Sequence, residues 1–180
     1  MCSIRRSLSV LLLAFALATS TLAGPNAGGV LNVHDANLVY TLDTSSYCRL
    51  GVIPDSCGAI DTNVESSSPE EPRVWKVYAV FPDTSSPRLK GLTFGVHYSP
   101  DSLVITAYGP CIGDPNNGAA EFPGPGWPGS DTGTALVFQN VQTNQLVECY
   151  WFAGYNDTES PTIFLVRAHP DSSLGGTFAD

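Results

Sequence analysis

The stretch RVWKVYAVF, residues 73–81, decides the fold class of this chain. Its apolar side chains stand at every second position and would share one face of an extended strand: Trp75, Val77, Ala79 and Phe81. A helix, with 3.6 residues per turn, would distribute the same side chains around its axis. The stretch therefore predicts a β-strand with one face in a hydrophobic core.

Short runs of the same kind, separated by turn residues, make up most of the chain. Residues 89–98 alternate clearly, with an apolar face of Leu92, Phe94, Val96 and Tyr98. Further strands are expected at residues 30–33, 37–42, 103–108, 134–139, 146–155 and 162–168, and loops at 61–72 and 109–133. These eight strands predict an all-β single-domain β-sandwich with jelly-roll or immunoglobulin-like topology.

The first 23 residues have the pattern of a secretory signal peptide. Arg5 and Arg6 precede an apolar run at residues 8–18, and small residues follow up to Ala23. The run is shorter than the roughly 20 residues that cross a bilayer, and the mature chain contains no other run of that length. We expect cleavage after Ala23, a domain at 24–180, and a secreted product, extracellular or periplasmic. A cut after Ala18 and an uncleaved anchor are the alternatives.

The charge of the chain excludes some classes of partner. The formal net charge is −9, and loss of the two signal-peptide arginines would change it to about −11. Nucleic acids and anionic lipids are bound by clustered lysines and arginines, which this chain lacks. The sequence therefore predicts no nucleic-acid partner and no membrane span in the mature chain.

Four cysteines remain after the signal peptide, and four cysteines allow three pairings. Cys48 and Cys57 flank a short loop that contains a glycine and a proline, which predicts a disulfide between them. Cys111 and Cys149 are the second expected pair, with two free buried thiols as the alternative. The chain has no Cys-x-x-Cys motif, which disfavours a zinc knuckle or a thioredoxin-like site.

Two resemblances suggest a class of function. Residues 89–109, LKGLTFGVHYSPDSLVITAYG, resemble the central strand–turn–strand of cohesin-type and related carbohydrate-binding sandwiches. The blocks SPRLKGLTFG at 86–95 and YWFAGY at 150–155 are similar to blocks in uncharacterised secreted bacterial proteins. The first resemblance implies a binding or assembly module and not an enzyme.

The candidate catalytic residues form no specific pattern. The histidines, His34, His97 and His169, lie in separate segments without metal-ligand spacing, and the chain has no Gly-x-Ser-x-Gly elbow. Four carboxylates stand near aromatic residues without forming an obvious pair: Glu121, Asp131, Glu148 and Asp157. We therefore expect no catalytic residue and no resident metal or cofactor, with Glu148 on the solvent face of its strand.

One loop and two aromatic residues are candidates for ligand binding. The oxygen-rich loop GDPNNG, residues 113–118, suggests a calcium site near Asp114, although an Asx turn explains it equally well. Trp127, in the rigid segment PGWPG, and Tyr155, at the end of a strand, could stack on sugar rings. For Trp127 the alternative is a ring that folds back over one end of the sandwich.

The sequence therefore predicts a secreted, non-catalytic binding or assembly module whose partner is an extracellular glycan or protein. The alternative function is a small extracellular hydrolase.

Overall fold

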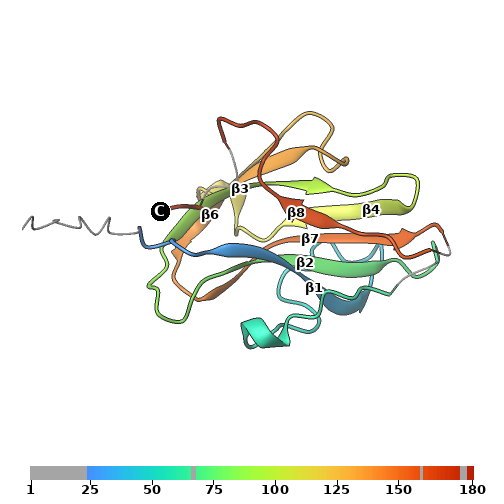
Figure 1. The fold of residues 1–180 in the computed structure, drawn as a ribbon, viewed down its shortest axis with the longest axis horizontal. Coiled ribbons are helices and arrows are strands. Elements are labelled where there is room, and N and C mark those ends of the chain that lie inside the picture. Colours follow the sequence, from blue (N-terminus) through green and yellow to red (C-terminus); the bar gives the residue numbers. More distant parts are fainter. Residues whose placement is uncertain (1–23, 66–67, 159, 175–177) are drawn as a thin grey trace, which may run out of the picture.

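Two antiparallel sheets pack face to face in the computed structural model, which describes residues 24–65, 68–158, 160–174 and 178–180 (Figure 1). Sheet A has the order β1 (Val30–Val39), β2 (Arg73–Val80), β7 (Leu146–Asn156) and β4 (Leu103–Pro110). Sheet B has the order β5 (Ala120–Pro123), β6 (Gly133–Gln142), β3 (Leu89–His97) and β8 (Leu165–Arg167), and β9 (Phe178–Ala179) also pairs with β3. The predicted all-β sandwich is confirmed, whereas the predicted signal peptide lies outside the described residues.

The core between the sheets contains the side chains that the alternating patterns predict. Trp75, Val77, Ala79 and Phe81 point inward from β2 and its end, and they meet Leu92, Phe94, Val96 and Tyr98 from β3 and its end. Burial of each large side chain contributes roughly 1.5–3 kcal/mol. The two strands that sequence patterning identified most clearly therefore form the centre of the sandwich.

The first strand is longer than predicted. Residues 30–33 and 37–42 were expected as separate strands, but β1 is continuous and contains an irregularity between Asp35 and Leu38. Asn37 there has a φ of 51°, and its N–H donates to Asp35 Oδ1 at 2.8 Å. Asparagine tolerates this left-handed conformation, so the strand is bent without being ended.

Three further differences concern short strands. β5 lies inside the expected loop at 109–133, and β9 has only two residues; neither is long enough to show a period. The strand expected at 162–168 is confined to β8, which pairs with only three residues of β3, Gly95–His97. These short segments become strands because they pair with a long neighbouring strand. The sequence of a short segment alone does not show that pairing.

A loop covers the outer face of sheet A. Residues 40–61 cross this face and form a second core, in which the Tyr47 ring lies 5.0 Å from the Trp151 ring. The other members are Ala36, Val74 and Ala153, with partly buried neighbours. As a result β2 is buried on both faces almost throughout its length.

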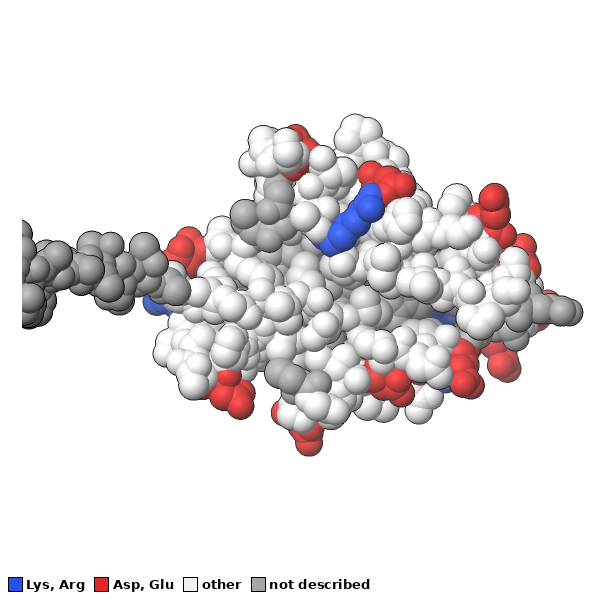
Figure 2. Space-filling model, viewed as in Figure 1, with Lys and Arg blue, Asp and Glu red and all other residues white. Residues whose placement is uncertain are grey.

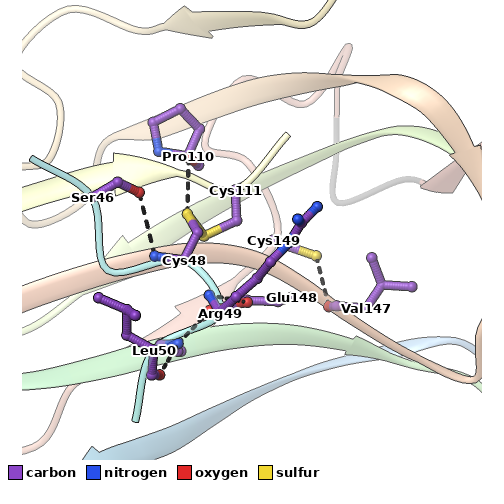
Figure 3. Close-up of a disulfide and its surroundings, with 10 residues drawn as sticks. Ser46, Cys48, Arg49, Leu50, Pro110, Cys111, Val147, Glu148 and Cys149 are labelled. Atoms are coloured by element: carbon purple, nitrogen blue, oxygen red, sulfur yellow. Dashed lines mark hydrogen bonds and ion pairs between the residues drawn. A yellow bond between two sulfur atoms is a disulfide. The ribbon is translucent and has the colours of Figure 1, made fainter. Parts of the chain in front are cut away.

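The loop also covers a buried charge pair. Lys76 Nζ, on β2, lies 2.5 Å from Glu148 Oε1 and donates to the carbonyl of Leu50 at 2.6 Å (Figure 3). Glu148 Oε2 accepts a hydrogen bond from the N–H of Arg49 at 2.9 Å. Glu148 does lie on the outer face of its strand, as predicted, but the loop shields it and leaves its side chain only 13% exposed.

A disulfide fastens the loop to sheet A. It joins Cys48 in the loop to Cys111 just after β4, with the Cα atoms 5.5 Å apart (Figure 3). The predicted pairings Cys48–Cys57 and Cys111–Cys149 are therefore wrong, because the loop folds back across the sheet and brings together cysteines 63 residues apart. Cys149 is a free thiol in the core between the sheets, where burial raises its pKa to about 12.

We expect non-reducing peptide mapping to recover a fragment that links Cys48 to Cys111. The double substitution Cys48→Ser/Cys111→Ser should lower the free energy of unfolding by about 2–4 kcal/mol, because the unfolded chain regains the freedom that the bond removes. Cys57→Ser is the control and should leave the linked fragment in place. Loss of that fragment in Cys57→Ser would contradict the observed pairing.

The charge pair leads to a second prediction. Glu148→Gln should lower the free energy of unfolding by about 3 kcal/mol, because Lys76 stays buried without its counter-charge. The double variant Lys76→Met/Glu148→Gln removes both charges and should be more stable than Glu148→Gln alone. Urea unfolding measures both free energies. A double variant less stable than Glu148→Gln would show that the unpaired charge of Lys76 does not cause the loss of stability.

Candidate functional site

A groove of about 1020 Å³ runs along one side of the sandwich. It lies between the edge strands β1 and β8, and Figure 2 views the molecule from this side. One wall is formed by β1 and the segment that follows the covering loop, at residues 62–65. The opposite wall is formed by residues 161–166, and Trp75 and Phe164 contribute aromatic surface.

The two walls differ in how they are held. Asp61, directly before the first wall, is fixed to β1: its N–H donates to His34 Nδ1 at 3.0 Å, and its carbonyl accepts from the Asp35 N–H at 2.7 Å. In the opposite wall, the Phe164 ring packs edge-on against Trp75 at 5.3 Å, while Ile163 is 67% exposed. The groove therefore combines an anchored wall with exposed apolar surface.

Polar side chains of several kinds line the groove. Arg73 is in the lining with two carboxylates, Glu65 and Glu71, and three amides, Asn32, Asn63 and Asn156. Two N–H groups of the lining residues, Arg73 Nε and Trp75 Nε1, are buried and have no hydrogen-bond partner among the described residues. Because both atoms are buried, neither is accessible from the open groove.

A second hollow of about 520 Å³ adjoins the groove and shares residues with it, including Arg73 and Glu65. It also contains Asp35, Asp61 and the buried His34. Arg73 Nη2 donates to Asn37 Oδ1 at 2.9 Å on this side. Arg73 therefore lines both hollows.

The two predicted ligand-binding aromatics have different surroundings. Tyr155 lines the groove and is partly exposed, so its ring is available to a ligand. Trp127 is buried, and its ring packs between those of Phe94, Tyr150 and Phe152 at 5.5–5.9 Å. The prediction of an exposed Trp127 ring is therefore wrong, and the alternative of a ring folded into the sandwich is correct.

A polar network holds Trp127 in place. Its Nε1–H donates to Tyr150 Oη at 2.8 Å, and Tyr150 Oη donates to Glu121 Oε1 at 2.8 Å. Thr134 donates to the same carboxylate oxygen at 3.0 Å. Burial raises the pKa of Tyr150 far above its ordinary value, so the phenol stays protonated and serves as the donor. Glu121 therefore has a structural role in this network.

Asp114 begins the short helix η2 (Pro115–Asn117). Its Oδ1 accepts hydrogen bonds from the backbone and side-chain nitrogens of Asn116, and its Oδ2 accepts one from Asn117 Nδ2. Both carboxylate oxygens therefore accept hydrogen bonds within the turn. This arrangement is the Asx turn that the sequence offered as the alternative to a calcium site. In the described ranges, no group of three or more His, Cys, Asp and Glu side chains could hold a metal ion.

The three histidines do not converge. His34 is buried beneath the covering loop, and His169 packs against Gly133, where an added Cβ would lie 2.4 Å from the imidazole. His97 is exposed, and its Nδ1 lies 2.9 Å from Asp131 Oδ1, which also contacts Arg167. This exposed trio lies on sheet B and the loop before β6, and none of its three side chains is in the groove lining.

Acidic side chains cover more of the face shown in Figure 2 than basic side chains do, although most of this face is uncharged. They are distributed over the visible face, and basic side chains cover only small areas of it. Among the residues that the structure describes, no helix has the length and apolar character needed to cross a membrane.

Comparison with known proteins finds no matching family model, no matching curated protein and no matching solved structure. The two resemblances noted in the sequence therefore stay predictions.

Most of the groove lining was not apparent from the sequence. Asn32, Asn63 and Arg73 come from strands and loops that are distant along the chain, and none of them forms a motif. The one available signal was the polar stretch 61–72, which was interpreted as an exposed loop and supplies part of one wall.

The Trp127 network can be tested by removing one hydroxyl. Tyr150→Phe should lower the free energy of unfolding by about 1–3 kcal/mol, because the Trp127 N–H loses its acceptor inside the core. Tyr108→Phe is the control: its ring also stacks on Tyr150 but is 43% exposed, and it loses only a hydroxyl with a long 3.4 Å hydrogen bond to the Trp127 carbonyl, which should cost less than about 0.5 kcal/mol. Equal losses in the two variants, measured by chemical denaturation, would contradict the role given to the network.

Proposed function

We propose that this chain is a secreted, non-catalytic binding module whose ligand occupies the groove between β1 and β8. The supporting observation is the lining of the groove, which combines charged and amide side chains, exposed apolar surface and the Tyr155 ring. Ligand sites in proteins are concave and mostly apolar, with a few polar groups that orient the ligand. At about 1020 Å³ the groove is at the upper end of the usual size range of such sites.

The rival function, a small extracellular hydrolase, would use the two carboxylates of the groove. Glycoside hydrolysis needs an acid and a second carboxylate on opposite sides of the scissile bond. Glu65 lies in the wall that follows the covering loop, Glu71 lies just before β2, and the opposite wall at 161–166 contributes no carboxylate. The lining therefore offers no carboxylate from the 161–166 wall to face Glu65, which favours binding over hydrolysis.

A second candidate is assembly with a protein through the outer face of sheet B. Phe122 on β5 and Leu165 on β8 are 61% and 49% exposed, and Phe122 is paired in register with Ala135. Exposed apolar side chains on one sheet face are typical of protein contact surfaces. Leu165 also lines the groove, whereas Phe122 lies on β5 at the other end of sheet B and does not, so a change at Phe122 distinguishes the two candidates.

The experiment is a glycan array combined with affinity capture from secreted fractions, using the chain and two variants. Tyr155→Ala should lower the affinity for a ligand in the groove by about tenfold, because the substitution removes aromatic contact area. Phe122→Ser is the matched control on sheet B and should leave groove binding unchanged. Loss of binding only in Phe122→Ser would favour the second candidate.

Turnover is measured on the same ligands. A bound glycan that stays intact supports the binding module, whereas its hydrolysis, abolished in Glu65→Gln or Glu71→Gln, would overturn the proposal in favour of the hydrolase.

A further inference from the structure

We infer that the ligand of the groove is an extended peptide segment of a partner protein, which adds to β1 as a strand and carries basic side chains on its solvent side. This inference rests on the proposed function and specifies the chemical class of ligand that the same site binds.

The first half of β1 is a sheet edge with unused hydrogen-bonding groups. The Asp35 N–H points away from β2, because it donates to Asp61 O at 2.7 Å. In an antiparallel pair the outward-pointing groups recur at every second residue, and the register of β1 on β2 is regular as far as Asp35. The N–H and C=O groups of Leu31 and Val33 therefore point outward as well, and they have no hydrogen-bond partner among the described residues.

The second half of the same edge is shielded. The Val52 N–H of the covering loop donates to the Ala36 carbonyl at 2.9 Å, and the irregularity between Asp35 and Leu38 bends the strand. Folded proteins commonly cover or bend their edge strands in this way, because unpaired backbone groups are a template for another strand. The open part of the edge is the part whose residues line the groove.

The edge of β8, on the other side of the groove, also presents backbone groups. The Val96 N–H donates to Thr132 O at 3.0 Å and its carbonyl accepts from the Asp131 N–H at 2.8 Å, so both groups point toward β6. Val166 is the register partner of Val96, and its own N–H and C=O groups therefore point away from β3. Backbone groups that face the open side of the sandwich thus come from both sheets.

Apolar surface lies beside these edges. Four side chains of the lining are partly buried and pack against the main core: Leu31, Val33, Phe164 and Val166. Successive side chains of an extended peptide point to opposite sides, so every second side chain of a bound strand would face this surface. In complexes of this kind the backbone bonds provide affinity, and the contacts of alternate side chains provide specificity.

The charges of the lining indicate the charge of the peptide. Glu65 and Glu71 line the groove, and Arg73 is the only Lys or Arg in the described lining. Glu65 accepts a hydrogen bond from Asn63 Nδ2 at 3.3 Å, but a neutral amide does not cancel a negative charge. The whole chain has a net charge of −9. Because complementary charges steer and orient a partner, we expect Lys or Arg at the peptide positions that face the solvent.

Fluorescence-polarisation titration with three pools of nonapeptides tests the inference. All pools have apolar residues at every second position, and the positions between them are Lys and Arg, Ser and Thr, or Asp and Glu. We expect the basic pool to bind most tightly, with an affinity that falls at least about threefold between about 0.05 M and 0.5 M salt. Glu65→Gln should weaken this binding by about two- to fivefold. Asp83→Asn, which removes one exposed charge outside the lining, is the matched control and should not.

Two measurements on the tightest basic peptide identify strand addition itself. Hydrogen exchange at the Leu31 and Val33 amides should slow by about tenfold in the complex, because these groups gain backbone partners. Exchange at Asn32 and His34, whose amides face β2, should change less. N-methylation of alternate peptide amides should abolish binding for one set of positions and spare the other, because only one set faces β1.

The outcomes separate this inference from the proposed function. If the peptides fail and a hexasaccharide of cellulose or chitin binds instead, weakened by Tyr155→Ala, the groove is a binding site and the peptide inference is wrong. The peptide inference is also wrong if a peptide binds without slowing exchange at Leu31 and Val33. Binding that neither slows this exchange nor responds to Tyr155→Ala lies outside the groove and contradicts both, and so does the absence of binding by any probe.

Discussion

The buried charge of Lys76 is the constraint on which much of this structure depends. A lysine in the middle of a central strand must have its charge compensated, and here Glu148 from the neighbouring strand and the carbonyl of Leu50 do so. The Leu50 carbonyl comes from the loop at 40–61, so this loop has to lie on sheet A. The Cys48–Cys111 bond and the contact of Tyr47 with Trp151 then hold the loop in place.

The position of the groove follows from this covering loop. Having crossed sheet A, the chain returns beside β1, where His34 and Asp35 bind the backbone of Asp61 and direct residues 62–65 along the edge of the sandwich. The open side between β1 and β8 thereby gains a polar wall that the two sheets alone would not supply. The proposed binding site is therefore a product of the loop as much as of the sandwich.

The features that sequence patterning missed all involve contacts between distant segments. Local spacing made Cys48 and Cys57 the natural pair, yet the partner of Cys48 lies 63 residues away because the loop folds over the sheet. The PGWPG context of Trp127 suggested an exposed ring, but the acceptor of its N–H, Tyr150, lies on another strand. Tyr155 lines the groove with a partly exposed ring, and its role in ligand binding stays a prediction; the amides around it were not identified.

The sequence by itself determined the class of fold, because alternation over residues 73–81 and 89–98 is a local property that is typical of strands with one apolar face in the core. It also determined the acidic character of the surface and the small number of basic residues. Only the tertiary structure decided which cysteines are bonded, which aromatic rings are buried and where the groove lies. These depend on how the 40–61 loop and the short strands pack, and the packing energies involve residues that are far apart in the chain.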